Sequence, residues 1–247
     1  MIRFHPSAQQ LKDFVEGTLS PATSLMVSAH CDMCAKCQRF VEIETESLAA
    51  QMVSAVSDNA FATSEASLQF GDMLSQITQL PQSPNGGVEG ANVAEYRETF
   101  NKKNSPRKPE KLGTIELDGR TFTIPRTLHR YIDKTGNWSS LVGKLWQAPV
   151  DLGNQGVANF IFMGSGGSVP EHTHRGTEYT LVIDGEFSDG LSRYDTGDFI
   201  FMDGDKTHTP KAEGKDGCLV FSIVDQPLHF TSGLARLLNP FSHLFFR

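Results

Sequence analysis

The sequence changes character near residue 111, and this change constrains the fold more than any other feature. Before it, long helix-compatible runs dominate; after it, short β-branched and aromatic segments alternate with Asp-Gly dipeptides. Residues 81–90 are rich in Pro, Gly, Ser and Asn, as in a linker. We therefore expect a two-domain α + β protein: a helical domain over residues 1–85, a linker that can hold a short helix over 86–110, and a β domain over 111–247.

The first part carries clear helix start and stop signals. Ser7 is placed to cap a first helix, which Gly17 ends. Ser20-Pro21 begins a second run that has no internal Gly or Pro and reaches about Ala50. A third run covers about residues 58–80 and stops at Pro81. These signals predict three helices, the second of them long and continuous.

The second part predicts a β-sandwich or barrel of short strands. Residues 114–117 and 120–124 flank Asp118-Gly119, which indicates a hairpin with a type I′ turn. The other expected strands are Val157–Met163, Tyr179–Ile183, Asp198–Met202 and Cys218–Val224, with turns at Asp184-Gly185, Asp189-Gly190 and Asp203-Gly204.

Composition and charge exclude several classes of protein. The formal net charge is −7, whereas direct nucleic-acid binding needs a basic face. No stretch approaches the ~18 consecutive apolar residues of a membrane-spanning helix, and the N-terminus lacks the apolar core of a signal peptide. Three of the four cysteines cluster at positions 31–37, which favours reduced thiols and a metal over disulfides. We expect a cytoplasmic protein.

The cysteine cluster forms a candidate metal site with nearby histidines. In a helix, the side chains of His30, Cys34 and Cys37 project from one narrow stripe, while Cys31 points elsewhere. Tetrahedral zinc takes four N or S ligands, and His5, just before the first helix, is the expected fourth. The site would be structural, so that folding of the helical domain depends partly on the metal.

Other interpretations of this cluster stay open at the level of sequence. The spacing Cys31-x2-Cys34-x2-Cys37 also begins an iron–sulfur motif, although no fourth cysteine lies nearby. A second alternative is that the cysteines are metal-free core residues, since free cysteine is commonly buried. His5 could be an ordinary surface residue.

A second candidate metal site lies in the β part. His172, His174 and Glu178 are separated by two and four positions, even intervals that place them on one side of an extended segment, and His208 follows a later strand. Three imidazoles and a carboxylate suit zinc or another divalent transition metal.

The second site resembles that of the cupins. The block from Gly166 to Gly185 matches the first cupin motif, G-x5-H-x-H-x3,4-E-x6-G, at every defined position. The second motif, G-x5-P-x-G-x2-H-x3-N, keeps Gly197 and His208, whereas Asp203, Asp205 and Ala212 replace its Pro, Gly and Asn. These departures put the geometry of the turn in doubt more than metal binding. The resemblance implies a jelly-roll-like cupin β-barrel.

His5 with His30-x3-Cys34-x2-Cys37 resembles the zinc-binding anti-sigma domain, and this domain followed by a cupin is the layout of ChrR-type anti-sigma factors. The resemblance covers nearly the whole chain. It implies a transcription regulator, not an enzyme, that inhibits an extracytoplasmic-function sigma factor. The cupin would act as the sensor that releases the sigma factor under oxidative, singlet-oxygen-type stress. The resemblance also allows a small-molecule ligand in the cupin and self-association of the chain when no sigma factor is bound.

The acidic balance of the first part fits such a partner. Residues 1–80 hold four basic and nine acidic side chains, a balance of −5, and a sigma factor must present a basic face to DNA. The acidic residues could also be no more than a solvated surface.

Two other classes of function compete with the regulator. A metal-dependent cupin enzyme, such as a dioxygenase or isomerase with a helical zinc-binding extension, would use open coordination positions at the second site. A ligand-storage or metal-trafficking protein fits less well, because the helical site looks too enclosed to exchange its metal.

Overall fold

The computed structural model describes residues 1–58, 72–76, 78–79, 113–140, 144–153, 157–174, 176–204, 206–226, 228–231, 233, 236 and 239. The chain divides into two compact units, Met1–Thr45 with Leu112–Arg247 and Glu46–Lys111. The first unit contains both histidine-rich clusters. The division does not coincide with the domain limits expected from sequence, which remain predictions. Most of the expected third helix and all of the short linker helix lie outside the described residues.

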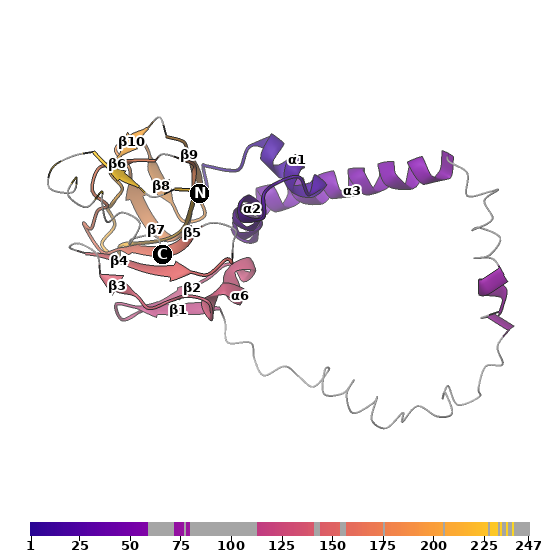
Figure 1. Ribbon diagram of the computed structural model, residues 1–247, viewed down its shortest axis with the longest axis horizontal. Coiled ribbons are helices and arrows are strands. Elements are labelled where there is room, and N and C mark those ends of the chain that lie inside the picture. Colours follow the sequence, from indigo (N-terminus) through magenta and orange to yellow (C-terminus); the bar gives the residue numbers. More distant parts are fainter. Residues whose placement is uncertain are drawn as a thin grey trace, which may run out of the picture. The chain divides into compact units, whose positions relative to one another are not determined.

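Local capping explains where the helices begin and end (Figure 1). In α1 (Ala8–Glu16), Ser7 and Gln10 form a reciprocal capping box, and Gly17 ends the helix in the left-handed conformation. Ser20 caps α2 (Pro21–Met33), and α3 covers Ala35–Asp58. The expected continuous helix from Ser20 to about Ala50 is therefore wrong, because the chain bends at residue 34. None of the described helices combines the length and apolarity needed to span a bilayer.

The expected hairpin opens the β part. Strands β1 (Thr114–Leu117) and β2 (Arg120–Thr123) pair in antiparallel register across Asp118 and Gly119. Both turn residues have positive φ, 53° and 71°, which confirms the type I′ turn. A short 3-10 helix, η1 (Arg126–Leu128), and α6 (His129–Ile132) follow.

Two further sheets form the rest of the β part (Figure 1). The larger has the order β11-β7-β12-β5-β4-β3, and β8 and β9 also pair with β7. The smaller has the order β10-β6-β13. The bounds are β3 (Ser139–Ser140), β4 (Leu145–Val150), β5 (Val157–Met163), β6 (His172–Thr173), β7 (Glu178–Ser188), β8 (Arg193–Asp195), β9 (Phe199–Met202), β10 (Thr207–His208), β11 (Lys211–Ala212), β12 (Cys218–Val224) and β13 (His229–Phe230).

One expected turn is instead an irregularity inside a strand. Asp184-Gly185 lies within β7, where the register with β12 shifts between Leu219 and Val220. Gly185 has φ 90°, and a Cβ there would overlap the carbonyl oxygen of Gly217. The register with β12 passes from Val182 to Asp184 and skips Ile183, so a β-bulge lies directly before the Asp-Gly pair. A glycine beside a bulge is a second common use of this residue in a sheet.

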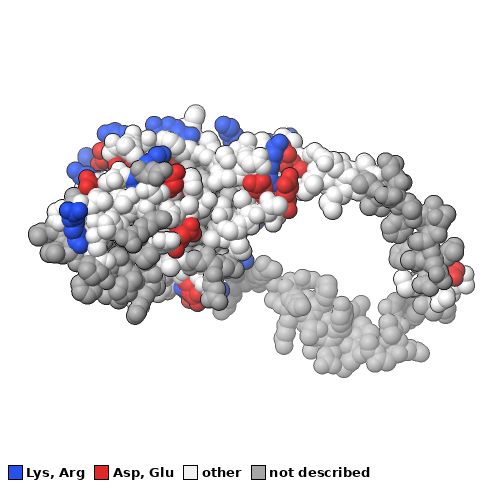
Figure 2. Space-filling view, turned by 45° about the horizontal axis from the view of Figure 1, so that its top comes forward, with Lys and Arg blue, Asp and Glu red and all other residues white. Residues whose placement is uncertain are grey.

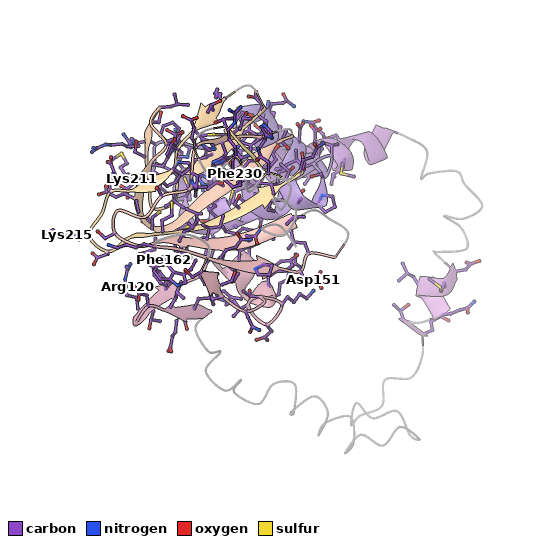
Figure 3. All side chains as sticks on the ribbon, turned by 60° about the vertical axis from the view of Figure 1, so that its left-hand side comes forward. Arg120, Asp151, Phe162, Lys211, Lys215 and Phe230 are labelled. Atoms are coloured by element: carbon purple, nitrogen blue, oxygen red, sulfur yellow. The ribbon has the colours of Figure 1, made fainter. Side chains whose placement is uncertain are left out.

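The core joins the helices to the β part. Met26 and Val27 of α2 are fully buried and share one cluster with β-strand residues such as Phe160 and Phe221. Phe162, labelled among the strands in Figure 3, belongs to the same cluster. Ser28 and Asp32 add hydrogen bonds from α2 to Thr127 of η1. The N-terminal helices are thus built onto the β part by apolar burial, the dominant favourable term in folding.

Candidate metal centres

Four side chains from different parts of the N-terminal region meet at one point. His5 precedes α1, His30 lies in the last turn of α2, Cys34 is the residue between the helices, and Cys37 lies in the first turn of α3. Their ligand atoms all lie within 4.8 Å of one another. We call this group the helical centre.

The bend at Cys34 makes this convergence geometrically feasible. On a straight helix, seven residues rise about 10.5 Å, so His30 and Cys37 would share a stripe but stand far apart along it. Cys34 instead adopts an extended conformation, with φ −118° and ψ 98°. The bend brings His30 Nε2 to within 3.3 Å of Cys37 Sγ. The stripe argument selected residues whose side chains do converge, but it overlooked the rise along the helix.

The spacing of the ligand atoms fits a tetrahedral ion. His5 Nδ1 lies 3.4 Å from both Cys34 Sγ and Cys37 Sγ. Zinc bonds of about 2.05 Å to nitrogen and about 2.3 Å to sulfur, at tetrahedral angles, would separate these atoms by about 3.5 Å. His30, Cys34 and Cys37 are at most 4% exposed. The four side chains thus supply a closed N2S2 donor set that fits a structural metal.

The local environment keeps both histidines neutral. Burial lowers the pKa of His30 to about 4, and burial followed by the charge of Lys36 lowers the pKa of His5. Burial, with the nearby Cys34, raises the pKa of Cys37 to about 12, so the metal-free thiol keeps its proton. Neutral imidazoles present a lone pair to a cation without first losing a proton.

Cys31 lies outside the helical centre, as expected. Its thiol is half-buried and lines an open groove of about 920 Å³ between the helices and the β1–β2 hairpin. Burial, with the neighbouring Cys34, raises the pKa of Cys31 to about 11. The thiol is therefore protonated at neutral pH, which disfavours reactivity.

The second group of side chains lies in the β part. His172 is on β6, His174 follows it, Glu178 begins β7 and His208 is on β10. Because β10 pairs with β6, His208 lies directly opposite His172. We call these four residues the barrel centre.

The barrel centre holds more lone pairs than protons. His208 Nε2 lies 2.9 Å from the Nε2 atoms of both His172 and His174. His172 Nδ1 donates to the Pro170 carbonyl at 2.8 Å, which leaves its Nε2 as an acceptor when the ring is neutral. One Nε2–H on His208 cannot satisfy both neighbours. Separations of 2.9 Å match nitrogens bound at about 2.1 Å and near right angles, and a cation at their common point would fit.

Polar neighbours orient the carboxylate of this centre. Glu178 Oε2 lies 3.0 Å from His174 Nε2, while Oε1 accepts hydrogen bonds from Ser222 at 2.8 Å and Thr180 at 3.0 Å. Burial alone raises the pKa of Glu178, but the His174 contact and the other imidazoles outweigh it and hold the pKa below its usual range. Burial, with His208, lowers the pKa of His172 to about 4. A neutral His172 and an ionised Glu178 are in the protonation states that bind a metal.

A small apolar cavity adjoins the barrel centre. Its volume is about 50 Å³, and its walls include His172, Glu178 and His208 together with Met163 and Met202. Typical ligand pockets measure about 300–1,000 Å³. The described cavity therefore admits only a few water molecules or a very small ligand beside the metal position.

Comparison with known proteins decides the family. The chain is 31% identical over 97% of its length to the anti-sigma-E factor ChrR of Cereibacter sphaeroides, of which it covers 98%. It belongs to the ChrR family of anti-sigma factors. Residues 133–226 match the model of the ChrR cupin-like domain. The crystal structure of Rhodobacter sphaeroides SigE in complex with the anti-sigma ChrR matches with TM-score 0.55 and 28% identity, covering 91% of this chain and all of the other.

Membership in the ChrR family confirms the resemblance stated from the motifs. The fold class is also confirmed, because N-terminal helices precede a curled cupin-like sheet. The departures from the second cupin motif leave His208 in place: Gly204, beside Asp203, accepts a hydrogen bond from Thr173 at 3.0 Å, and Ala212 is buried on β11. Asp205 lies outside the described residues.

Sequence reasoning missed the residues that support the ligands of this ChrR-family protein. The carbonyl of Gly197 accepts a hydrogen bond from His30 Nδ1 at 2.9 Å, although 167 positions separate the two residues. Ser222 and Thr180 support Glu178 from the main sheet. No local spacing signals these pairs; the even spacing of Glu178 and Thr180 on one strand face is the only partial hint.

Proposed function

We propose that this ChrR-family chain binds an extracytoplasmic-function sigma factor through its N-terminal region and keeps it from RNA polymerase core. Identity to the anti-sigma-E factor ChrR over nearly the full length of both chains carries the proposal. The likeness to ChrR in complex with SigE supports it. Because a sigma factor acts on RNA polymerase, we place the protein in the cytoplasm, without direct contact to nucleic acid or membrane.

The exposed start of α3 supports a basic partner. Figure 2 shows acidic side chains gathered beside the long helix, next to a few basic ones. Within α3, Glu42 and Glu46 are exposed, and a guanidinium nitrogen of Arg39 lies 3.7 Å from a carboxylate oxygen of Glu42. An exposed ion pair of this kind contributes little to the stability of the fold. Its acidic and basic side chains can therefore separate and pair with charges on a partner at little cost. Complementary charge accelerates association and improves selectivity.

We assign zinc to the helical centre in a structural role. The support is its closed donor set, His5, His30, Cys34 and Cys37, and the match of its spacings to tetrahedral geometry. When bound, the ion would cross-link the segment before α1 to α2 and α3. The chain's own residues then shape the surface presented to the sigma factor.

We assign zinc or another divalent transition metal to His172, His174, Glu178 and His208, and a sensing role to the cupin-like part. The support is the excess of lone pairs and the small apolar cavity at the cluster. When bound, the metal would supply a Lewis acid next to that cavity. We propose that an oxidative, singlet-oxygen-type signal is read here and ends in release of the sigma factor.

Co-expression tests the main proposal. The full chain is co-expressed and purified with each extracytoplasmic-function sigma factor of its source organism, and the molar mass of each complex is measured in solution. We expect a 1:1 complex with at least one sigma factor and loss of transcription from its promoter when the chain is added. Failure of every sigma factor to bind, with both metals present, would overturn the proposal. Self-association of the free chain is measured in the same experiment.

An enzyme built on the barrel centre is the second candidate. The three imidazoles and one carboxylate favour it, since such clusters also support oxygen and hydrolytic chemistry. The cavity of about 50 Å³ argues against any but the smallest substrate. Turnover of a small metabolite by the metal-loaded chain, abolished by Glu178→Gln, would favour this function.

A further inference from the structure

The residues before α1 lie on a turn of the cupin-like part. We call Met1–Pro6 the N-terminal segment and Thr196–Asp198, between β8 and β9, the β8–β9 turn. Asp198 Oδ1 accepts hydrogen bonds from the backbone N–H groups of Arg3 at 2.7 Å and Phe4 at 3.0 Å. The N–H of Phe199 in turn donates to the carbonyl of Phe4 at 3.0 Å. These bonds hold the backbone just before His5.

Apolar contacts tie the same segment down. The ring of Phe4 lies 4.8 Å from that of Tyr194, centroid to centroid. Ile2 packs over Gly197, where a Cβ would lie 2.5 Å from Ile2 Cδ1. Gly197 also has φ 90°, a conformation that other residues rarely adopt. The turn is therefore shaped to receive the N-terminal segment.

The β8–β9 turn also touches a second ligand of the helical centre. The Gly197 carbonyl accepts the Nδ1–H of His30 at 2.9 Å, which leaves Nε2 to face Cys37. The ring of Phe199 packs edge-on against His30, with centroids 5.8 Å apart. Two of the four ligands, His5 and His30, are thus held by one turn of the β part.

Asp198 connects the N-terminal segment to the β8–β9 turn. Its side chain is fully buried, and its second oxygen accepts the N–H of Asp195 at 2.8 Å, which closes the turn. Among the described residues, the three hydrogen bonds that this carboxylate accepts all come from backbone N–H groups. Hydrogen-bonded partners of metal ligands commonly change metal affinity 10–100-fold when mutated.

We propose that Asp198 is a positioning residue for the helical metal centre: it anchors the N-terminal segment that carries His5 and holds the turn whose carbonyl orients His30. The metal affinity of the helical centre then depends on the cupin-like part. This inference goes beyond sigma-factor binding and needs only that the helical centre binds a metal.

Cobalt binding to the full chain tests the proposal. Cobalt(II) bound by thiolates gives a charge-transfer band, and only the helical centre has sulfur ligands among the two described clusters. Competition with a chelator, followed at this band, gives the affinity of the helical centre alone. For Asp198→Asn we expect a 10–100-fold loss, because the amide cannot accept from both sides of the turn. Cobalt at the barrel centre should bind as in the unmodified chain.

Asp189→Asn is the matched control. Asp189 is also buried and accepts the backbone N–H groups of Leu191 and Ser192 in a neighbouring turn. Its other oxygen accepts the hydroxyl of Tyr194, a contact that an amide can also make, and among the described residues no hydrogen bond joins Asp189 to the N-terminal segment. It should destabilise the fold comparably and leave the cobalt–thiolate affinity within about twofold. Equal affinity in Asp198→Asn and the unmodified chain overturns the proposal. An equal loss in both variants also overturns it, since it would show general destabilisation.

Deletion of Ile2–Phe4 provides an independent route if Asp198→Asn does not fold. It leaves His5 and the whole β part in the chain, and we expect a similar loss of cobalt affinity. Combining both changes should add little to either alone, because they interrupt the same contact. Undiminished affinity in the deletion variant overturns the proposal. Absence of a thiolate band in the unmodified chain would overturn it together with the zinc assignment, whereas sigma-factor binding is measured separately.

Discussion

The side chains of Cys34 and Cys37 converge on one point although their backbone conformations differ. Cys34 is the extended residue that separates α2 from α3, and Cys37 lies in the first turn of α3, yet both sulfurs are 3.4 Å from His5 Nδ1. The bend allows two cysteines three positions apart to face one ion together with a residue near the start of the chain. The connection between α2 and α3 is therefore part of the centre itself.

Replacing Cys34 should empty the helical centre and spare the barrel centre. We expect Cys34→Ala to lower the metal content by one ion per chain and to expose α1 and α3 to hydrogen exchange, because the closed site loses a ligand. Elemental analysis after gel filtration measures the first effect. Cys31→Ala is the matched control and should keep both metals, since Cys31 lies outside the cluster. Loss of both ions, or of neither, in Cys34→Ala would contradict two independent sites.

Replacing Glu178 should remove the metal of the barrel centre and leave that of the helical centre in place. Glu178→Gln keeps the shape of the side chain but removes the charge that faces three imidazoles, so we expect loss of the barrel metal and an unchanged cobalt–thiolate band. Glu171→Gln is the control, because Glu171 lies in the same region but bonds to Thr231 instead of the cluster. Retention of two metals by Glu178→Gln would show that this carboxylate is not a ligand.

The metal-free protein should lose stability as the pH falls from about 6.5 to about 4. Burial lowers the pKa of both His30 and His172 from 6.5 to about 4, so in this window the unfolded chain binds protons that the folded chain does not. Each such proton lowers the free energy of unfolding by up to about 1.4 kcal/mol per pH unit. Urea titrations with a chelator present measure the slope. His30→Gln should make it shallower; an unchanged slope would contradict the shifted pKa.

Gly185 should tolerate no side chain. Its φ of 90° strains any other residue, and a Cβ there would overlap the Gly217 carbonyl oxygen. Gly190 has φ 87° but open space around it, so Gly190→Ala isolates the strain, about 1–2 kcal/mol. We expect Gly185→Ala to lower the free energy of unfolding by clearly more than Gly190→Ala, as measured by urea denaturation. Equal losses would show that the neighbouring strand yields without cost.

Short-range patterns predicted much of the local structure. Ser7 and Gly17 delimit α1, and Asp118-Gly119 forms the expected type I′ turn, because capping and positive φ depend on residues only a few positions apart. The same kind of reasoning failed at Asp184-Gly185, where a turn-like dipeptide lies in the middle of a long strand. Whether such a pair makes a turn or a bulge depends on the neighbouring strand, here β12, which the local sequence does not specify.

The residue types and spacings were sufficient to select the members of both side-chain clusters, since imidazole, thiol and carboxylate groups carry their metal-binding chemistry wherever they are placed. Their spatial arrangement was decided by long-range packing. The bend at Cys34 overrides a local helix preference. The packing of α2 on β7 and η1 and the hydrogen bond from His30 to Gly197 join segments more than 90 positions apart. Such contacts form only when buried surfaces meet, and no local periodicity encodes them.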